Sequence, residues 1–171
     1  MLTGCAVRLT EIRPEDSDVL YGWINDPETV RHNAPFAPVT RLQHNEWFAS
    51  IGKNSSKSLF AIRPLDSEVL LGTVQLIDIH PVHRTAELTI RIGKDANRGK
   101  GYGTDALKLL VDTAFRDMNL VRVWLRVFSS NSRAIRAYEK AGFEKEGVMR
   151  KAVWINGSRL DEVVMAVVRE D

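Results

Sequence analysis

The chain has 171 residues, which is enough for one domain with a sizeable core, and we expect a single domain over residues 1–171. Hydrophobic residues make up 44% of it and charged residues 27%, and the formal net charge of +2 is too small to indicate nucleic-acid binding. The single cysteine, Cys5, excludes an internal disulfide and suits a cytoplasmic protein, and no apolar run is long enough to predict a membrane span.

The first half of the chain predicts one strand, three helices and two further strands. Alternating apolar and polar residues indicate the strands, Pro14 and the acids after it suit the first turn of a helix, and Thr40 suits an N-cap. In chain order, the expected elements are a strand at 6–12, a helix from 14 towards 23, a short helix restarting at 25, a helix after 40, and strands at 58–62 and 69–79.

The second half predicts a β-α-β unit, a helix and a hairpin. A strand at 86–92, a helix at 103–118 and a strand at 120–128 should place two strands in parallel. A helix over 131–140 follows, and Asn156-Gly157 between two alternating runs indicates a hairpin. The predicted fold class is therefore α/β, with a mixed central sheet of about seven strands flanked by helices.

Residues 92–106 join a strand to a helix through a basic, glycine-rich turn. Its cations are Arg98 and Lys100, and its alternate glycines are Gly99, Gly101 and Gly103. Backbone N–H groups at a helix N-terminus, together with the helix dipole, favour negative charge, and glycine lets the backbone approach a ligand closely. The turn therefore predicts a site for a phosphate or pyrophosphate.

Two common nucleotide-binding loops fit this turn poorly. A P-loop needs four residues between its first glycine and Gly-Lys-Ser/Thr, but five separate Gly93 from Gly99, and Lys100 precedes a glycine. Residues 101–106 satisfy the dinucleotide pattern G-x-G-x-x-A, but the next strand, residues 121–127, has no carboxylate to bind a ribose. A nucleotide-dependent oxidoreductase is thus a weak alternative.

A third loop pattern, Arg/Gln-x-x-Gly-x-Gly/Ala, matches residues 98–103, and residues 131–143 match Asn-x-x-Ala-x-x-x-Tyr-x-x-x-Gly-Phe. Both segments resemble the GNAT superfamily of N-acetyltransferases, most specifically over residues 73–168. The resemblance fits the branch with ribosomal-protein N-terminal and spermidine N-acetyltransferases. It implies a GNAT fold, acetyl coenzyme A as cosubstrate and a homodimer.

The same resemblance implies where acetyl coenzyme A binds. Loop cations and glycine N–H groups would hold the pyrophosphate, the strand backbone near Ile90 would bind the pantetheine arm and the thioester carbonyl, and Asn131 would contact pantetheine or phosphate while also suiting an N-cap. The expected cofactor-binding residues are Ile90, Arg91, Ile92, Arg98, Gly99, Lys100, Gly101, Tyr102, Gly103, Thr104 and Asn131.

Acetyl transfer to an amine needs a proton donor for the departing thiolate. By the resemblance, Tyr138 lies beside the coenzyme sulfur and fills this role, because a tyrosine with an ordinary pKa near 10 is protonated at neutral pH. The alternative is that Tyr138 only packs its helix against the sheet. If it is the acid, Tyr138→Phe should lower turnover much more than coenzyme affinity.

The reaction also needs a base, because an aliphatic ammonium with a pKa of about 10.4 is mostly charged at neutral pH. Glu87, at the start of the strand that enters the site, is the candidate; otherwise it pairs with Arg84 or Arg91. His80 and His83 are less favoured bases in a surface turn. These acids and histidines lack a compelling ligand spacing, so no metal site is expected.

The acceptor amine would be recognised within residues 16–50. A protein N-terminus, a polyamine, an amino sugar or an aminoglycoside all remain open, although a polyamine site should gather carboxylates and the sequence pI is about 8.8. The candidate pocket residues are Trp23, Asn25, Asp26, His32, Phe36, Glu46 and Trp47. The alternative to an enzyme is a catalytically silent module that senses acetyl coenzyme A.

Overall fold

The structure is a computed structural model that describes residues 1–30, 37–93 and 97–170 of the chain. Its strands are β1 (Leu2–Thr3), β2 (Val7–Thr10), β3 (Ser58–Pro64), β4 (Gly72–His80), β5 (Thr85–Ile92), β6 (Arg122–Phe128), β7 (Glu144–Ile155) and β8 (Ser158–Val168). Its helices are the 3-10 helix η1 (Pro14–Asp16) and the α-helices α1 (Ser17–Ile24), α2 (Pro27–Val30), α3 (Arg41–Ser50), α4 (Tyr102–Arg116) and α5 (Ser132–Lys140).

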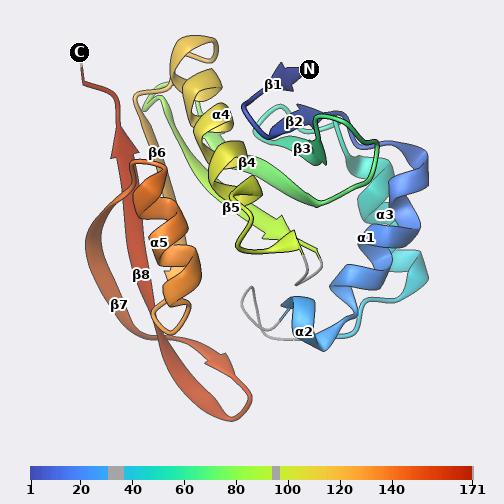
Figure 1. The fold of residues 1–171 in the computed structure, drawn as a ribbon. Coiled ribbons are helices and arrows are strands. Elements are labelled where there is room, and N and C mark those ends of the chain that lie inside the picture. Colours follow the sequence, from blue (N-terminus) through green and yellow to red (C-terminus); the bar gives the residue numbers. More distant parts are fainter. Residues whose placement is uncertain (31–36, 94–96, 171) are drawn as a thin grey trace.

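The strands form one sheet in the order β1-β2-β3-β4-β5-β6-β8-β7 (Figure 1). β5 and β6 are parallel, as the β-α-β pattern predicts, and the other neighbours are antiparallel. The α/β class and the mixed sheet are confirmed. The sheet has eight strands rather than about seven because β1, only two residues long, is too short to show alternation in the sequence.

Helices cover both faces of this sheet. α4 turns one apolar side, which includes Leu107, Leu110 and Ala114, towards the main core, and α5 adds Tyr138 to the same core. A smaller core on the opposite face joins α1 to the sheet through Trp23 and Ala61. Spacings of three and four residues along α4 give it one continuous apolar side, which explains its placement.

The N-terminal segment is attached to the first turn of α4 by one carboxylate. Asp105 accepts hydrogen bonds from the backbone N–H groups of Cys5, Ala6 and Val7 at 3.2, 2.7 and 2.9 Å. An acid in the first turn of a helix also interacts favourably with the helix dipole. This contact holds the start of the chain beside the glycine-rich turn.

The two parallel strands separate part of the way along the sheet. Their pairing runs from Thr85↔Arg122 to Glu87↔Trp124 and goes no further among the described residues. β5 continues to Ile92 along β4, while β6 continues to Phe128 along β8. The later part of β5 therefore has one edge without a strand partner, and the sheet opens there.

Candidate active site

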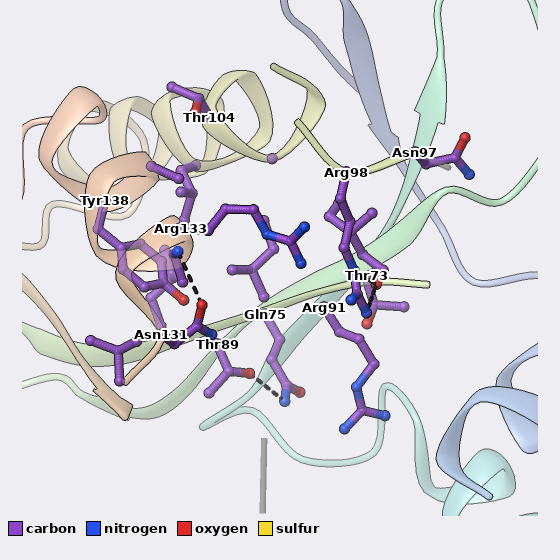
Figure 2. Close-up of a pocket in the computed structure, with 18 of the residues that line it drawn as sticks. Thr73, Gln75, Thr89, Arg91, Asn97, Arg98, Thr104, Asn131, Arg133 and Tyr138 are labelled. Carbon is purple, nitrogen blue, oxygen red and sulfur yellow. Dashed lines mark hydrogen bonds between the residues drawn. The ribbon is translucent and has the colours of Figure 1, made fainter. Parts of the chain in front are cut away.

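A cavity of about 1160 Å³ occupies this opening. Its walls come from β4, β5 and β6, from the glycine-rich turn with the start of α4, and from α1, α3 and α5 (Figure 2). Ligand sites in proteins usually have volumes of about 300–1,000 Å³, so the cavity has room for more than one small molecule.

The glycine-rich turn forms one end of the cavity. Gly99 and Gly101 have φ angles of +77° and +85°, a left-handed backbone that favours glycine, and Gly101 is the N-cap residue of α4. Arg98 donates from Nε and Nη2 to the carbonyl oxygen of Ile92 at 3.3 and 3.2 Å, which holds the turn against the end of β5. Free N–H groups in the first turn of α4 can then bind an anion.

Most of the predicted cofactor residues line the cavity. These are Ile90, Arg91, Ile92, Arg98, Gly99, Gly101, Gly103, Thr104 and Asn131. Lys100 is exposed outside the cavity wall, and Tyr102 packs against the main core instead. Sequence reasoning did not name the cations of α5 that also line the cavity, Arg133, Arg136 and Lys140. Their spacing of three and four residues on one helix face was a usable signal.

The α5 side contributes Asn131 and Tyr138. Asn131 is the N-cap residue of α5, where its Oδ1 accepts from the N–H of Ala134 at 3.2 Å, and it also faces the cavity (Figure 2). Tyr138 is only 8% exposed and its ring contacts Phe143 edge-on, with centroids 5.9 Å apart. Burial raises the pKa of Tyr138 to about 12, so its hydroxyl keeps its proton at neutral pH.

Glu87 is buried on β5 and forms an ion pair. Its Oε1 lies 3.1 Å from Nε of Arg126 on β6, so its partner is neither Arg84 nor Arg91. The hydrogen bond with Glu87 raises the pKa of Arg126 above its ordinary value. Arg126 and Glu162 line the cavity, and Nη1 of Arg126 lies 3.9 Å from Oε2 of Glu162. Two carboxylates thus surround one guanidinium.

The side chains of β5 divide the cavity into two sides. A Cβ atom on Gly103 would lie 3.8 Å from Ile92 and 3.9 Å from Ile90, so both isoleucines face α4. Because side chains alternate along a strand, Thr89 and Arg91 point to the opposite face. There Gln75 Nε2 donates to Thr89 Oγ1 at 2.9 Å (Figure 2).

Only part of the predicted acceptor region reaches the cavity. Trp47 lines it, together with His44, which sequence reasoning did not name and whose Nε2 lies 3.0 Å from Ser17 Oγ. Trp23 instead packs on Gly93, where a Cβ would come within 2.1 Å of its ring.

The remaining predicted acceptor residues have other positions. Asn25 hydrogen-bonds both backbone groups of Val39, at 2.9 and 3.0 Å, and Asp26 and Glu46 are not among the lining residues. His32 and Phe36 lie outside the described residues.

The two histidines before β5 lie away from the cavity. The rings of His80 and His83 stack with centroids 4.1 Å apart, and both side chains are exposed. Among the described residues, no three histidine, cysteine, aspartate or glutamate side chains are arranged to hold a metal ion. Within the same ranges, no helix combines the length and apolar character of a membrane span.

Comparison with known proteins identifies the family. The acetyltransferase (GNAT) domain family matches residues 6–144. A spermidine N(1)-acetyltransferase of Escherichia coli K12 is 38% identical over 98% of this chain and 88% of its own length. A probable N-acetyltransferase of Bacillus subtilis is 40% identical over 66% of this chain and 62% of its own length.

Solved structures give the same result. Spermidine N-acetyltransferase from Vibrio cholerae, in complex with CoA and spermine, superposes with a TM-score of 0.84 at 26% identity, over 95% of both chains. The long match to the family model and the agreement in fold are consistent with the cavity found where β5 and β6 separate. The chain therefore belongs to the GNAT acetyltransferase family and is an acetyl-CoA-dependent N-acetyltransferase.

Proposed function

We propose that this protein transfers the acetyl group of acetyl coenzyme A to a primary amine by direct attack, through a tetrahedral intermediate. The observation that carries the proposal is the unpaired edge of β5 beyond Glu87, which opens into a cavity between an anion-binding turn and Tyr138. Pyrophosphate binding, an extended backbone edge and a protonated hydroxyl are together what a thioester acetyl donor requires.

Each part of the coenzyme has a matching surface. The pyrophosphate would bind the N–H groups of Gly99, Gly101 and the first turn of α4, with charge from Arg98 and from the cations of α5. The pantetheine arm carries amides and would lie along the free edge of β5 as an added strand does. This arrangement directs the thioester towards Tyr138.

The chemistry then follows from the groups at the end of β5. The amine nitrogen attacks the thioester carbon, a C–N bond forms, and the carbonyl oxygen becomes an oxyanion that backbone N–H groups near Ile90 stabilise. The C–S bond breaks, Tyr138 gives its proton to the sulfur, the attacking nitrogen loses a proton to the base, and Tyr138 regains a proton from solvent. With a pKa of about 12, Tyr138 is protonated at neutral pH, so the proton is present when the sulfur leaves.

For the base, we retain Glu87 as the proposed residue. Glu87, Glu162 and Arg126 together carry one net negative charge, which favours an incoming ammonium. If Glu87 is the base, Glu87→Gln should lower kcat and alter the pH profile, whereas Glu162→Gln should affect only binding of the amine. Equal losses with unchanged pH profiles would assign both carboxylates to the positioning of Arg126.

The names of the relatives support a small-molecule amine as acceptor, because several are spermidine N-acetyltransferases. A protein N-terminus, an amino sugar and an aminoglycoside are the other candidates. A homodimer, a cytoplasmic location, a single domain over residues 1–171 and the absence of a metal or nucleic-acid partner stay predictions. Sedimentation of the purified chain tests the prediction of a homodimer.

The first experiment is thermal unfolding with acetyl coenzyme A, coenzyme A, ATP and NAD, each added separately. A ligand specific for the native state at about one hundred times its Kd adds about 2.7 kcal/mol of stability. Stabilisation by the two coenzyme A forms alone, followed by thiol release with amines, is the expected result. A shift without any amine-dependent thiol release favours the silent sensor, and a larger shift with NAD contradicts the proposal.

A further inference from the structure

Arg91 is a mostly buried cation in the cavity that has no partner in the part of the chain that the structure describes. The described residues offer it no hydrogen bond and no ion pair, and its Nε is buried without an acceptor. Burial lowers the pKa of Arg91 from its ordinary value, but a guanidinium stays protonated at neutral pH. A buried charge without a partner is costly, so a fold that keeps one has a use for it.

The position of Arg91 separates it from the phosphate-binding end. Ile90 and Ile92 face α4 and the glycine-rich turn, so Arg91 lies on the opposite face of the sheet. In Figure 2 its side chain extends away from Thr104, at the start of α4. The pyrophosphate is thus served by other cations, which leaves Arg91 available to a group of the acceptor.

The cross-strand neighbours of Arg91 on this face are uncharged. Thr73 on β4 pairs directly with Arg91, and Gln75 pairs with Thr89, so the β4 side chains next to Arg91 on this face are a hydroxyl and an amide. The nearest carboxylate on the same face of β5 is Glu87, four residues away, or about 13 Å at 3.3 Å per residue, and it pairs with Arg126. The face therefore has a negative group at one end and a lone cation at the other.

We propose that the acceptor amine also carries a carboxylate or a phosphate, and that Arg91 binds this anionic group while the amine approaches from the Glu87 side. This inference rests on the proposed acetyl transfer. A guanidinium binds either oxyanion through two parallel N–H donors. A polyamine has only cationic nitrogens and would bring positive charge against Arg91, so spermidine should be a poor acceptor here despite the names of the relatives.

The test compares matched amines that differ only in the anionic group. Thiol release from acetyl coenzyme A is measured with a dipeptide and its C-terminal amide, with glucosamine 6-phosphate and glucosamine, and with spermidine. The first pair tests a carboxylate and the second a phosphate. The wild type should prefer the anionic member of at least one pair by about 10- to 100-fold in kcat/KM, the usual effect of a hydrogen bond to a charged group.

Variants of Arg91 test whether the preference for anionic amines comes from its side chain. Arg91→Gln should remove the preference mainly through KM of the anionic acceptor, and Arg91→Lys should restore part of it. The matched control is Arg150→Gln, because Arg150 is exposed on β7, outside the cavity lining, and its loss changes the net charge equally. Stabilisation by coenzyme A, measured for every variant, verifies that the fold and the coenzyme site are intact.

The outcomes separate the two proposals. An equal or better rate with the uncharged or polycationic amines, unchanged in Arg91→Gln, overturns the anionic acceptor and leaves the acetyl transfer standing. If coenzyme A stabilises the protein but none of these amines releases thiol, acetyl transfer itself fails, and the role of Arg91 fails with it. A preference for one anionic class that disappears in Arg91→Gln supports both and names the class.

Discussion

Two arginines on the same face of the sheet, one buried and one mostly buried, differ in their partners. Arg63 on β3, 2% exposed, donates to Asp16 Oδ2 at 2.6 Å, to Thr10 Oγ1 at 3.1 Å and to the carbonyl of Glu68 at 2.5 Å. Arg91 on β5 has no such partner among the described residues. Direct pairing of Ala61 with Thr73, and of Thr73 with Arg91, puts both arginines on one face.

The difference separates a structural cation, Arg63, from Arg91, the cation that we propose binds the acceptor. Arg63 joins η1, β2 and the segment between β3 and β4, and its charge is neutralised by Asp16 inside the protein. Arg91 receives nothing comparable, so its desolvation reduces stability until a ligand arrives. Functional sites often retain such unfavourable groups, whereas structural regions satisfy theirs.

The largest effect should follow from breaking the Arg63 region. Asp16→Ala leaves Arg63 buried without its counter-charge and should cost about 3–5 kcal/mol in the free energy of unfolding. Chemical denaturation measures this. The matched control is Asp18→Ala, because Asp18 is an exposed acid paired with Arg41 at 2.6 Å and should matter little. Equal losses in the two variants would contradict a structural role for the buried pair.

The second largest effect is expected on turnover, from a substitution at Tyr138 in the cavity. Tyr138→Phe should lower kcat about 100-fold, or about 2.7 kcal/mol, because the thiolate loses its proton donor. KM for acetyl coenzyme A and thermal stability should change little. Since the pKa of Tyr138 is about 12, its deprotonation should not lower the activity of the wild type below about pH 10. Unchanged turnover in the variant would reduce Tyr138 to a packing residue.

The third prediction concerns Asp105, which attaches the N-terminal segment to the first turn of α4. Partial burial raises the pKa of Asp105, but its hydrogen bonds from Ala6, Val7 and Cys5 outweigh this and hold the pKa below the ordinary value. A lowered pKa means that the carboxylate stabilises the fold above its unfolded pKa of about 3.9 and that this contribution disappears as the pH falls through the folded pKa.

Asp105→Asn should therefore cost about 2 kcal/mol at pH 7, the usual range for hydrogen bonds to a charged group. Unfolding curves of the wild type and the variant, recorded from pH 7 down to about pH 3, should converge at the acid end. A difference that does not depend on pH would show that the charge of Asp105 is unimportant.

The smallest effect, and the most direct test of the comparison, is on stability at Arg91. Without a ligand, Arg91→Gln should change the free energy of unfolding by no more than about 0.5 kcal/mol, or increase stability, because no partner is lost. Arg63→Gln, measured beside it, should be strongly destabilising. If both arginines behave alike, Arg91 has a structural role that its surroundings do not reveal.

Local sequence patterns were sufficient for much of this molecule. The helix-forming residues of α4, the N-cap Asn131 and the left-handed glycines of the turn act over a few residues, so their structure could be predicted. Strand β1 has no such pattern. The pairing of Glu87 with Arg126 also lacked a local signal, because it joins residues 39 positions apart on two strands.

The sequence by itself therefore determined the parallel β-α-β unit, the glycine-rich turn before α4 and the family, because periodicity, glycine backbone freedom and motif spacing are local properties. Only the tertiary structure decided where β5 and β6 separate and which side chains share the cavity. It also decided that Arg63 is neutralised, whereas Arg91 has no counter-charge among the described residues. Desolvation and charge compensation depend on every element packed around a group, and those neighbours come from distant parts of the chain.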